Sequence, residues 1–297
     1  MKLAERKKLW LGTAACLVLV SILLLLTKGL NFGIDFTGGT LLERRLPVAT
    51  NGTEIMEQLS QLDLDLGQPV IQMAGDRDAI IRTAPLDSTE IDLVDAKLAE
   101  AYGDVEVRRT EMVGPVIGGE LIRKGLWSLG LAAILMLIYV AFRFEWTFGV
   151  AAVLPLLHNV LVVCGLFALL GMEINTNFIA AILTIVGYSI NDTIVIFDRI
   201  RENRRNQPKL DQDTLVDTSV TQSLTRTINT SVTTLLVLVA LLILGGSTIR
   251  DLVIGLIAGI VVGTLSSLFL ASPLWLWLEE RKKTAYYETG TKSPKRD

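Results

Sequence analysis

Six apolar runs, each long enough to cross a lipid bilayer, constrain this chain more than any other feature of its sequence. They lie near residues 9–29, 125–142, 147–170, 178–198, 227–245 and 252–278. A helix rises about 1.5 Å per residue, so about 20 apolar residues span the roughly 30 Å hydrocarbon layer. The sequence therefore predicts a polytopic α-helical membrane protein with six transmembrane helices.

The first apolar run follows the basic segment MKLAERKK, an arrangement that also opens secretory signal peptides. Its apolar part is too long for a signal peptide, and no A-x-A-like cleavage site follows, so we interpret it as an uncleaved anchor. Cys16 and Cys164 fall in different predicted spans, where we expect them to pack as small apolar residues without a disulfide or a metal.

The distribution of basic residues between the spans predicts the orientation of the chain. One side of a six-helix arrangement receives the basic N-terminus, Arg143, five basic residues within 199–209, and Arg281, Lys282 and Lys283. The opposite short loops hold no Lys or Arg in 171–177 and only Arg250 in 246–251, although Arg123 and Lys124 do not fit the pattern. Since Lys and Arg favour the cytoplasmic side, both termini are predicted to be cytoplasmic, with residues 279–297 as a cytoplasmic tail.

Residues 30–124, between the first two spans, are too polar for a bilayer and long enough for a small core, so they predict an extracytoplasmic domain. Their periodicity predicts a strand at 33–46, a helix at 53–62, strands at 69–74 and 78–83, a helix at 88–101 and a strand at 104–112. This β-α-β-β-α-β order favours a small α+β domain of the ferredoxin-like type. Ser88 is the expected N-cap of the second helix, and Gly75-Asp76 the turn between the middle strands.

This domain has no Ser/His/Asp set, no Cys/His cluster and no glycine-rich phosphate loop, so its sequence predicts no catalytic site. The chemistry of interest falls in the membrane. The fourth span contains Asp192, about seven residues before Arg199, which places a carboxyl roughly 10 Å inside the helix end. An ionisable residue at the centre of a bilayer costs about 2.5–3.5 kcal/mol on insertion scales, so it needs a partner, water or a function.

The fifth span begins with polar residues that recur at helical spacing, namely Gln222, Arg226, Asn229, Thr230 and Thr233. Arg226 is expected at a depth comparable to that of Asp192 on the neighbouring antiparallel helix, so the two are a candidate pair. Two interpretations stay open. The pair is either a static buried ion pair that docks two helices, or a protonation switch that couples proton passage to helix motion.

Other polar residues of the spans are candidates for supporting roles. His158 follows Pro155 in the third span and is a candidate proton relay or a hydrogen-bonded packing residue. Tyr188, Ser189, Asn191 and Thr193 flank Asp192 and either line a wet path or bond across helices. In the sixth span, Gly255, Gly259 and Gly263 form a small-xxx-small pattern that predicts close helix packing.

Four segments together resemble the SecD/SecF family of the resistance-nodulation-division superfamily. They are GIDFTGGTLLE after the first span, VGPVIGGEL before the second, GYSINDTIVIFDRIRENRR in the fourth and SLTRTINTSVTT in the fifth. The resemblance runs nearly end to end and implies a subunit of the bacterial inner membrane with six helices. It implies that the subunit pairs with SecD and assists SecYEG and SecA, with YajC and YidC as further partners, in exporting unfolded preproteins.

The resemblance also implies roles for particular residues. The family's transmembrane Asp and the Arg of its fifth span are regarded as proton-pathway residues and match Asp192 and Arg226, the two residues already selected. The family's third span often carries His followed by Asp, whereas here Asn159 follows His158. The GIDFTGG segment, with Asp35, Gly38 and Gly39, matches a signature at the junction with the soluble domain, where the glycines allow a hinge or unusual turns and Asp35 a local cap.

The leading hypothesis is an accessory motor subunit, driven by protons and the proton motive force, that performs no enzymatic chemistry, needs no cofactor and binds no nucleic acid. A small-molecule transporter or half of a multidrug pump is a second class, which the small outer segment of about 95 residues argues against. A structural assembly factor is a third class. A charge-neutral substitution at Asp192 distinguishes it from the motor.

Overall fold

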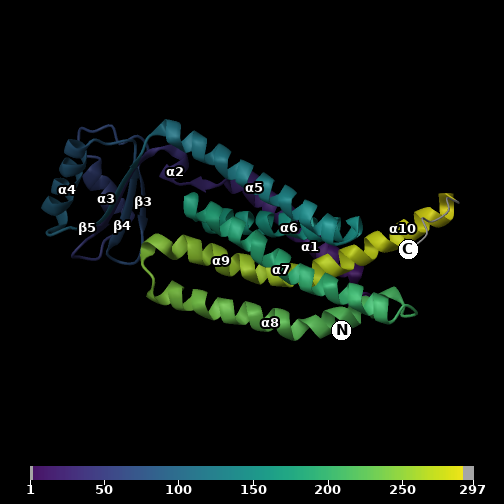
Figure 1. Cartoon of the computed structure of the whole chain (residues 1–297). Coiled ribbons are helices and arrows are strands. Elements are labelled where there is room, and N and C mark those ends of the chain that lie inside the picture. Colours follow the sequence, from purple (N-terminus) through teal and green to yellow (C-terminus); the bar gives the residue numbers. More distant parts are fainter. Residues whose placement is uncertain (1–2, 290–297) are drawn as a thin grey trace. The chain divides into compact units, whose positions relative to one another are not determined.

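The computed structural model describes residues 3–289 and divides the chain into two compact units. The helical unit comprises the chain up to Asn31, Ser128–Met172 and the chain from Asn177 onward. The sheet unit comprises Phe32–Trp127 and the short segment Glu173–Thr176. The predicted tail at 279–297 lies outside the described residues from 290 onward. Figure 1 labels the helices and strands of both units.

Six helices in residues 3–289 are long and apolar enough to cross a membrane, which confirms the predicted number of spans. The helices that supply them are α1 (Lys7–Lys28), α5 (Pro115–Arg143), α6 (Trp146–Leu170), α7 (Thr176–Asn206), α8 (Gln212–Leu244) and the continuous stretch α9 (Ser247–Ser266), η1 (Ser267–Ala271) and α10 (Ser272–Thr289). The η1 segment is a π-helical turn, a local widening of the helix.

Four of the spans are extended by polar helix: α5 begins at Pro115 before the predicted 125–142, and α10 ends at Thr289 after the predicted 252–278. The other two, predicted at 178–198 and 227–245, belong to α7 and α8. Helix α7 continues to Asn206 and α8 already begins at Gln212. Hydropathy detects only the apolar part of a helix, whereas the polar part is stabilised by capping and packing. Asp211 caps α8, because its side chain accepts a hydrogen bond from the Thr214 backbone N–H at 2.9 Å.

The main core of the helical unit is aromatic at its centre. The Phe148 ring packs 5.0 Å from Phe197 and 4.8 Å from Trp275, measured between ring centroids. The N-terminal segment belongs to the same core, since Leu3 and Ala4 are buried there. Asp217 of α8 accepts hydrogen bonds from both of their backbone N–H groups, at 2.7 and 3.1 Å, so α8 holds the segment that precedes α1.

The sheet unit contains the predicted β-α-β-β-α-β order of elements. Strands β2 (Gly39–Arg45), β3 (Val70–Met73), β4 (Asp78–Thr83) and β5 (Glu106–Val113) form one antiparallel sheet in the order β3-β4-β2-β5. Helices α3 (Gly52–Leu59) and α4 (Ser88–Tyr102) fill the two crossovers and share a core with the sheet. Figure 1 shows both helices beside the strands.

Two local predictions for this unit are wrong. The strand predicted at 33–46 starts only at Gly39, because Ile34–Thr37 form one helical turn, α2. That turn ends at Gly38, whose φ of 73° stops the helix. The N-cap of α4 is Asp87 and not Ser88, since Asp87 and Glu90 bond reciprocally in a capping box. The turn at Gly75-Asp76 is confirmed, with the Ala74 N–H bonded to the Asp78 carbonyl at 2.7 Å.

Glu173–Thr176, between α6 and α7, packs with the sheet unit, which no pattern in the sequence indicates. There β1 (Asn31–Phe32) and β6 (Glu173–Ile174) form a small second sheet, and the Gly33 N–H donates to the Ile174 carbonyl at 2.9 Å. Arg82 of β4 lies 3.2 Å from Glu173, and both side chains are nearly buried. A short loop between two spans thus belongs to the sheet unit.

Candidate functional site

The candidate site is centred on Asp192, in the middle of α7. Its side chain is buried, with 3% exposure, and its Oδ2 atom has no hydrogen-bond partner. Most buried polar atoms in proteins are hydrogen-bonded, because an unpaired one loses its hydration without compensation. Burying the Asp192 carboxyl therefore costs stability, and no hydrogen bond to its Oδ2 atom offsets that cost.

Small polar side chains line the buried face of α7 beside Asp192. The Ser189 Oγ accepts a hydrogen bond from the Asn159 amide of α6 at 2.9 Å. The Thr193 hydroxyl lies 2.9 Å from the Ser267 hydroxyl, at the start of the π-helical turn, and Ser267 also donates to the Ser189 carbonyl at 3.2 Å. Such π-helical turns occur often at functional sites. Three helices are thus hydrogen-bonded together within one turn of Asp192.

The predicted direct pairing of Asp192 with Arg226 is absent, although the structure describes both residues. Arg226 is exposed on the surface of α8, whereas Asp192 is buried, and no ion pair joins the two side chains. The two side chains are therefore not paired in this conformation. The reason is rotational: Thr227 and Ser223 occupy the buried face of α8 and turn Arg226 away from it.

The polar stripe predicted on α8 forms an outward-facing surface of the chain. Gln222, Arg226, Asn229 and Thr233 are exposed, and Thr230 is half-buried. The threonine hydroxyls bond to their own helix, since Thr230 donates to the Arg226 carbonyl and Thr233 to the Asn229 carbonyl, at 2.7 and 2.9 Å. The exposed Asn229 amide and the Arg226 guanidinium stay available to another molecule.

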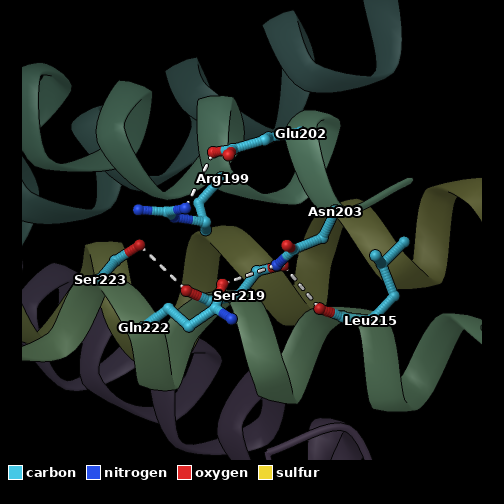
Figure 2. A network of polar contacts seen from close by, with 7 residues as sticks. All are labelled: Arg199, Glu202, Asn203, Leu215, Ser219, Gln222 and Ser223. Carbon is cyan, nitrogen blue, oxygen red and sulfur yellow. Dashed lines mark hydrogen bonds and ion pairs between the residues drawn. The ribbon is translucent and has the colours of Figure 1, made fainter. Parts of the chain in front are cut away.

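A network of hydrogen bonds joins α7 and α8 near the turn between them (Figure 2). The sequence analysis did not predict this network. Asn203 of α7 is buried, and its amide donates to the Ser219 hydroxyl and the Gln222 side-chain oxygen, both at 2.9 Å. In the sequence, Asn203 lies within the basic segment RIRENRR, and such a charged segment is typical of a solvent-exposed surface. Only the fold shows that this Asn faces α8.

His158 and Tyr188, both supporting candidates, make one side-chain contact each. The His158 Nδ1 lies 3.1 Å from the Asn159 side-chain oxygen, so Nδ1 is the donor and Nε2 the acceptor. That Nε2 is buried without a partner. The Tyr188 hydroxyl is 3.4 Å from the Thr234 hydroxyl of α8. Asn191 is exposed, so its side chain lies outside the buried hydrogen bonds that involve Ser189.

The signature residues Asp35, Gly38 and Gly39 lie in the sheet unit, apart from this site. Gly38 and Gly39 have φ angles of 73° and 129°, and a Cβ on Gly39 would meet the Thr83 carbonyl oxygen at 2.4 Å. The glycines are therefore required by backbone geometry. Asp35 bonds not to its own turn but to the backbone N–H of Thr176, the first residue of α7.

The glycines of the sixth span serve close packing, as predicted. A Cβ on Gly259 would lie 2.1 Å from the Ile185 Cδ1, and one on Gly263 would lie 3.2 Å from the Ser189 Cβ. Helix α9 therefore approaches α7 closely along the turns that lead to Asp192. Cys16 and Cys164 are both free cysteines.

Six candidate membrane-spanning helices, a sheet unit and a carboxyl buried in one of those helices define a multi-pass membrane protein. Residues 93–281 match the family model described as "Protein export membrane protein SecD/SecF, C-terminal", and residues 23–43 match the "SecD/SecF GG Motif". The match covers more than half of the chain. The chain therefore belongs to the SecD/SecF family.

Relatives and solved structures agree with this assignment. The protein translocase subunit SecF of Sebaldella termitidis is 40% identical over 98% of this chain and 96% of that relative. The SecF of Magnetococcus marinus is 42% identical over 97% and 96%. A crystal structure of SecDF, a translocon-associated membrane protein from Thermus thermophilus, matches with a TM-score of 0.86 and 38% identity over 95% of this chain and 39% of that longer one.

Proposed function

We propose that this chain is a subunit of the Sec protein-export machinery that uses the proton motive force, with Asp192 as the group that takes up and releases protons. The observation that carries the proposal is the buried Asp192 carboxyl with an unpartnered oxygen in a membrane-spanning helix. The names of the relatives, protein translocase subunits SecF and SecDF, support the export role.

The physical basis is that the charged and neutral forms of Asp192 favour different surroundings. The neutral carboxyl suits the present packing between α7, α6 and η1, whereas the carboxylate is favoured by water or by approach of Arg226. A rotation of α8 that brings Arg226 inward would thus accompany loss of the proton. A potential supplies about 2.3 kcal/mol per charge per 100 mV, and each pH unit about 1.4 kcal/mol, enough to bias two such states.

The partner proposed for the outward-facing stripe of α8 is SecD. In Thermus thermophilus, the relative named SecDF is a single chain, of which this chain matches 38% at 41% identity. The name of that relative, SecDF, supports pairing of this chain with SecD. The exposed amides and Arg226 of α8 would be costly against lipid, so a polar surface of a second membrane protein is the fitting cover.

The remaining parts of the proposal concern arrangement and partners. The strand order β3-β4-β2-β5 with helices in both crossovers supports a ferredoxin-like fold for the sheet unit, which we place on the extracytoplasmic side, where it meets the unfolded client. Both termini are then cytoplasmic. SecYEG and SecA, with YajC and YidC, are the proposed further partners. Protons are the proposed coupling ion, and no cofactor is proposed.

The test is export of a secretory protein into inverted membrane vesicles, with and without a proton gradient, for Asp192→Asn. This change keeps the size of the side chain and removes its titration. We expect the variant to assemble and to lose the part of export that depends on the gradient. Asp198→Asn is the matched control, because Asp198 lies on the same helix but is exposed and pairs with Arg143 at 3.2 Å.

Two outcomes would count against the proposal. Full gradient-dependent export by Asp192→Asn would remove the proton role from Asp192. Loss of SecD from the purified Asp192→Asn complex would show instead that the residue serves assembly, the role of a structural factor. Affinity purification of the wild-type chain with SecD and SecY supports the export assignment, whereas recovery of a periplasmic adaptor would favour a pump.

A further inference from the structure

A polar pocket lies at the end of the helical unit where α5 turns into α6, and Asp192 does not line it. Its volume is about 800 Å³, within the range of about 300–1,000 Å³ seen for ligand sites. The end of α5, the start of α6 and the C-terminal turns of α7 form its walls. The side chains that line it include four arginines, namely Arg143, Arg201, Arg204 and Arg205.

The carboxylates that line this pocket are already paired with arginines. The pairs are Asp198 with Arg143 at 3.2 Å, Glu145 with Arg204 at 2.6 Å, and Glu202 with Arg199 at 2.9 Å. Figure 2 shows the last of these pairs. Arg201 and Arg205 are left over: both are exposed, and neither lies within ion-pair distance of a carboxylate among the side chains that the structure describes. The pocket therefore presents two uncompensated guanidinium groups.

The two free guanidinium groups come from one face of α7. Arg201 and Arg205 are four residues apart, which places their Cβ atoms about 5–6 Å from each other. Like charges at this spacing destabilise a helix, and an anion held between them would remove that cost. The helix dipole favours cations in the last turn, where Arg204 and Arg205 lie, but Arg201 belongs to the turn before it.

Arg201 is also held in position for a ligand. Its Nη1 atom donates a hydrogen bond to the Arg143 carbonyl at the end of α5, at 3.3 Å. A guanidinium has five N–H donors, so most of those on Arg201 stay free while the group is anchored. Planar N–H donors of this kind match the oxygen atoms of a phosphate.

The pocket lies at the level of the membrane surface. Helices α5 and α6 are both candidate spans, and only two residues separate them, so the turn between them lies at one face of the bilayer. Arg201 bonds to Arg143 and Arg204 pairs with Glu145, and both partners belong to this turn. The guanidinium groups are thus at the depth where lipid headgroups lie.

An apolar surface leads along α5 to the same turn. Leu131, Leu135, Ile138 and Phe142 recur at helical spacing, and all four are exposed, Phe142 by 94%. Trp146, the first residue of α6, is 59% exposed, as is common for aromatic side chains at a membrane interface. An apolar track therefore ends beside a pocket that carries free cations.

From this arrangement we propose that the pocket binds the headgroup of one anionic phospholipid. Its phosphate lies between Arg201 and Arg205, and an acyl chain follows the exposed apolar face of α5 that ends at Phe142. An acidic segment of a protein would account for the two arginines but not for the apolar track at the depth of the bilayer. The site is separate from Asp192 and does not depend on the proposed proton role.

Native mass spectrometry of the full-length chain, released from bilayers of equal phosphatidylglycerol and phosphatidylcholine, tests the site. The wild type is expected to retain one phosphatidylglycerol in preference to phosphatidylcholine. Arg201→Gln and Arg205→Gln should each lower that preference several-fold, and the double variant at least tenfold, because charge-assisted bonds to the phosphate are lost.

Lys209→Gln is the matched control for the single variants. Lys209 is an exposed cation just after α7 that does not line the pocket, so its loss removes one charge and should leave the preference unchanged. Arg201 and Arg205 are exposed, so all these variants should melt at the wild-type temperature. Equal retention of phosphatidylglycerol by the wild type and the double variant overturns the proposal, and so does equal retention of the two lipids by the wild type.

Two further measurements identify the source of the phosphate. Inorganic phosphate added to the detergent-solubilised protein should not displace phosphatidylglycerol, and displacement would show a site for free phosphate and overturn the lipid assignment. A photo-crosslinker at Asn206, which is exposed and lines the pocket, should capture phosphatidylglycerol. Capture of a protein and no lipid would show that a partner occupies the pocket, which also overturns the proposal.

Discussion

The Asp35 side chain accepts a hydrogen bond from the backbone N–H of Thr176, with 2.8 Å between Oδ2 and the nitrogen. The two residues are separated by 141 positions in the chain, and Thr176 is the first residue of α7, the helix that carries Asp192. Asp35 lies in the GG-motif segment. A carboxylate of that motif therefore serves the N-terminus of α7, where the helix dipole favours negative charge.

Replacing Asp35 with Ala should lower stability by about 1 kcal/mol, the usual cost of losing an N-terminal cap. Asp35→Asn, which keeps an acceptor, should lose less. The measurement is thermal unfolding of the full-length protein in detergent. Asp63→Ala is the control, since Asp63 is exposed on a loop of the same unit. Equal melting temperatures for Asp35→Ala and Asp63→Ala would show that the contact stabilises nothing.

Removing Asp95 should be among the most destabilising changes in the sheet unit. Arg44 is fully buried, its guanidinium bonds to both oxygens of Asp95 at 2.6 and 2.9 Å, and it donates to the Arg109 carbonyl at 2.7 Å. Asp95→Ala leaves this charge without its anion, at a cost of about 3–5 kcal/mol.

The measurement is denaturant unfolding of the full-length Asp95→Ala protein, in which limited proteolysis reports the unfolding of the sheet unit. Asp92→Ala, a change on the exposed face of the same helix, provides the comparison. A loss below about 1 kcal/mol, the value typical of a surface ion pair, would show that Arg44 finds other partners or water.

Gly165 of α6 should tolerate no side chain, because α1 crosses it closely. A Cβ there would lie 2.6 Å from the Ser21 Cβ and 2.8 Å from the Ser21 Cα. Gly165→Ala should cost about 1–3 kcal/mol through overpacking. Gly130→Ala on α5 should cost nothing, since no atom lies within 4 Å of its Cβ position. Thermal unfolding of both variants in detergent distinguishes them, and an unchanged Gly165→Ala protein would contradict the close crossing.

Asp211 gives a predicted pH dependence outside the membrane. Hydrogen bonds from the Thr214 side chain and backbone lower the pKa of the Asp211 carboxyl below its ordinary value of about 3.9. A lowered pKa in the folded state means that the stabilisation is present above the ordinary pKa and is lost as the pH falls through the folded-state pKa.

The measurement compares melting temperatures of the wild type and Asp211→Asn between pH 6 and pH 3. Asn keeps the cap but does not titrate, so the wild type should lose its advantage only at the acid end. A difference between the two proteins that stays constant across this range would refute the assigned hydrogen bonds.

Much of the fold could be predicted because it depends on local chemistry. The six spans follow from apolar length alone, and the order of elements in the sheet unit follows from periodicity. The errors share a cause. The strand predicted across Ile34–Thr37 and the N-cap assigned to Ser88 rested on single residues read without their partners, whereas Gly38 and the reciprocal Asp87–Glu90 bonds decide those points.

The sequence by itself determined that an aspartate and an arginine fall within predicted spans, where a carboxyl or a guanidinium is costly whatever its surroundings. Asp192 and Arg226 were selected on that ground. Only the tertiary structure decided how they face, since helix rotation depends on the packing of every side chain around the axis. In the folded chain Asp192 is buried beside Ser189, and Arg226 is exposed. Asn203 is hydrogen-bonded to α8, and the loop between α6 and α7 belongs to the sheet unit.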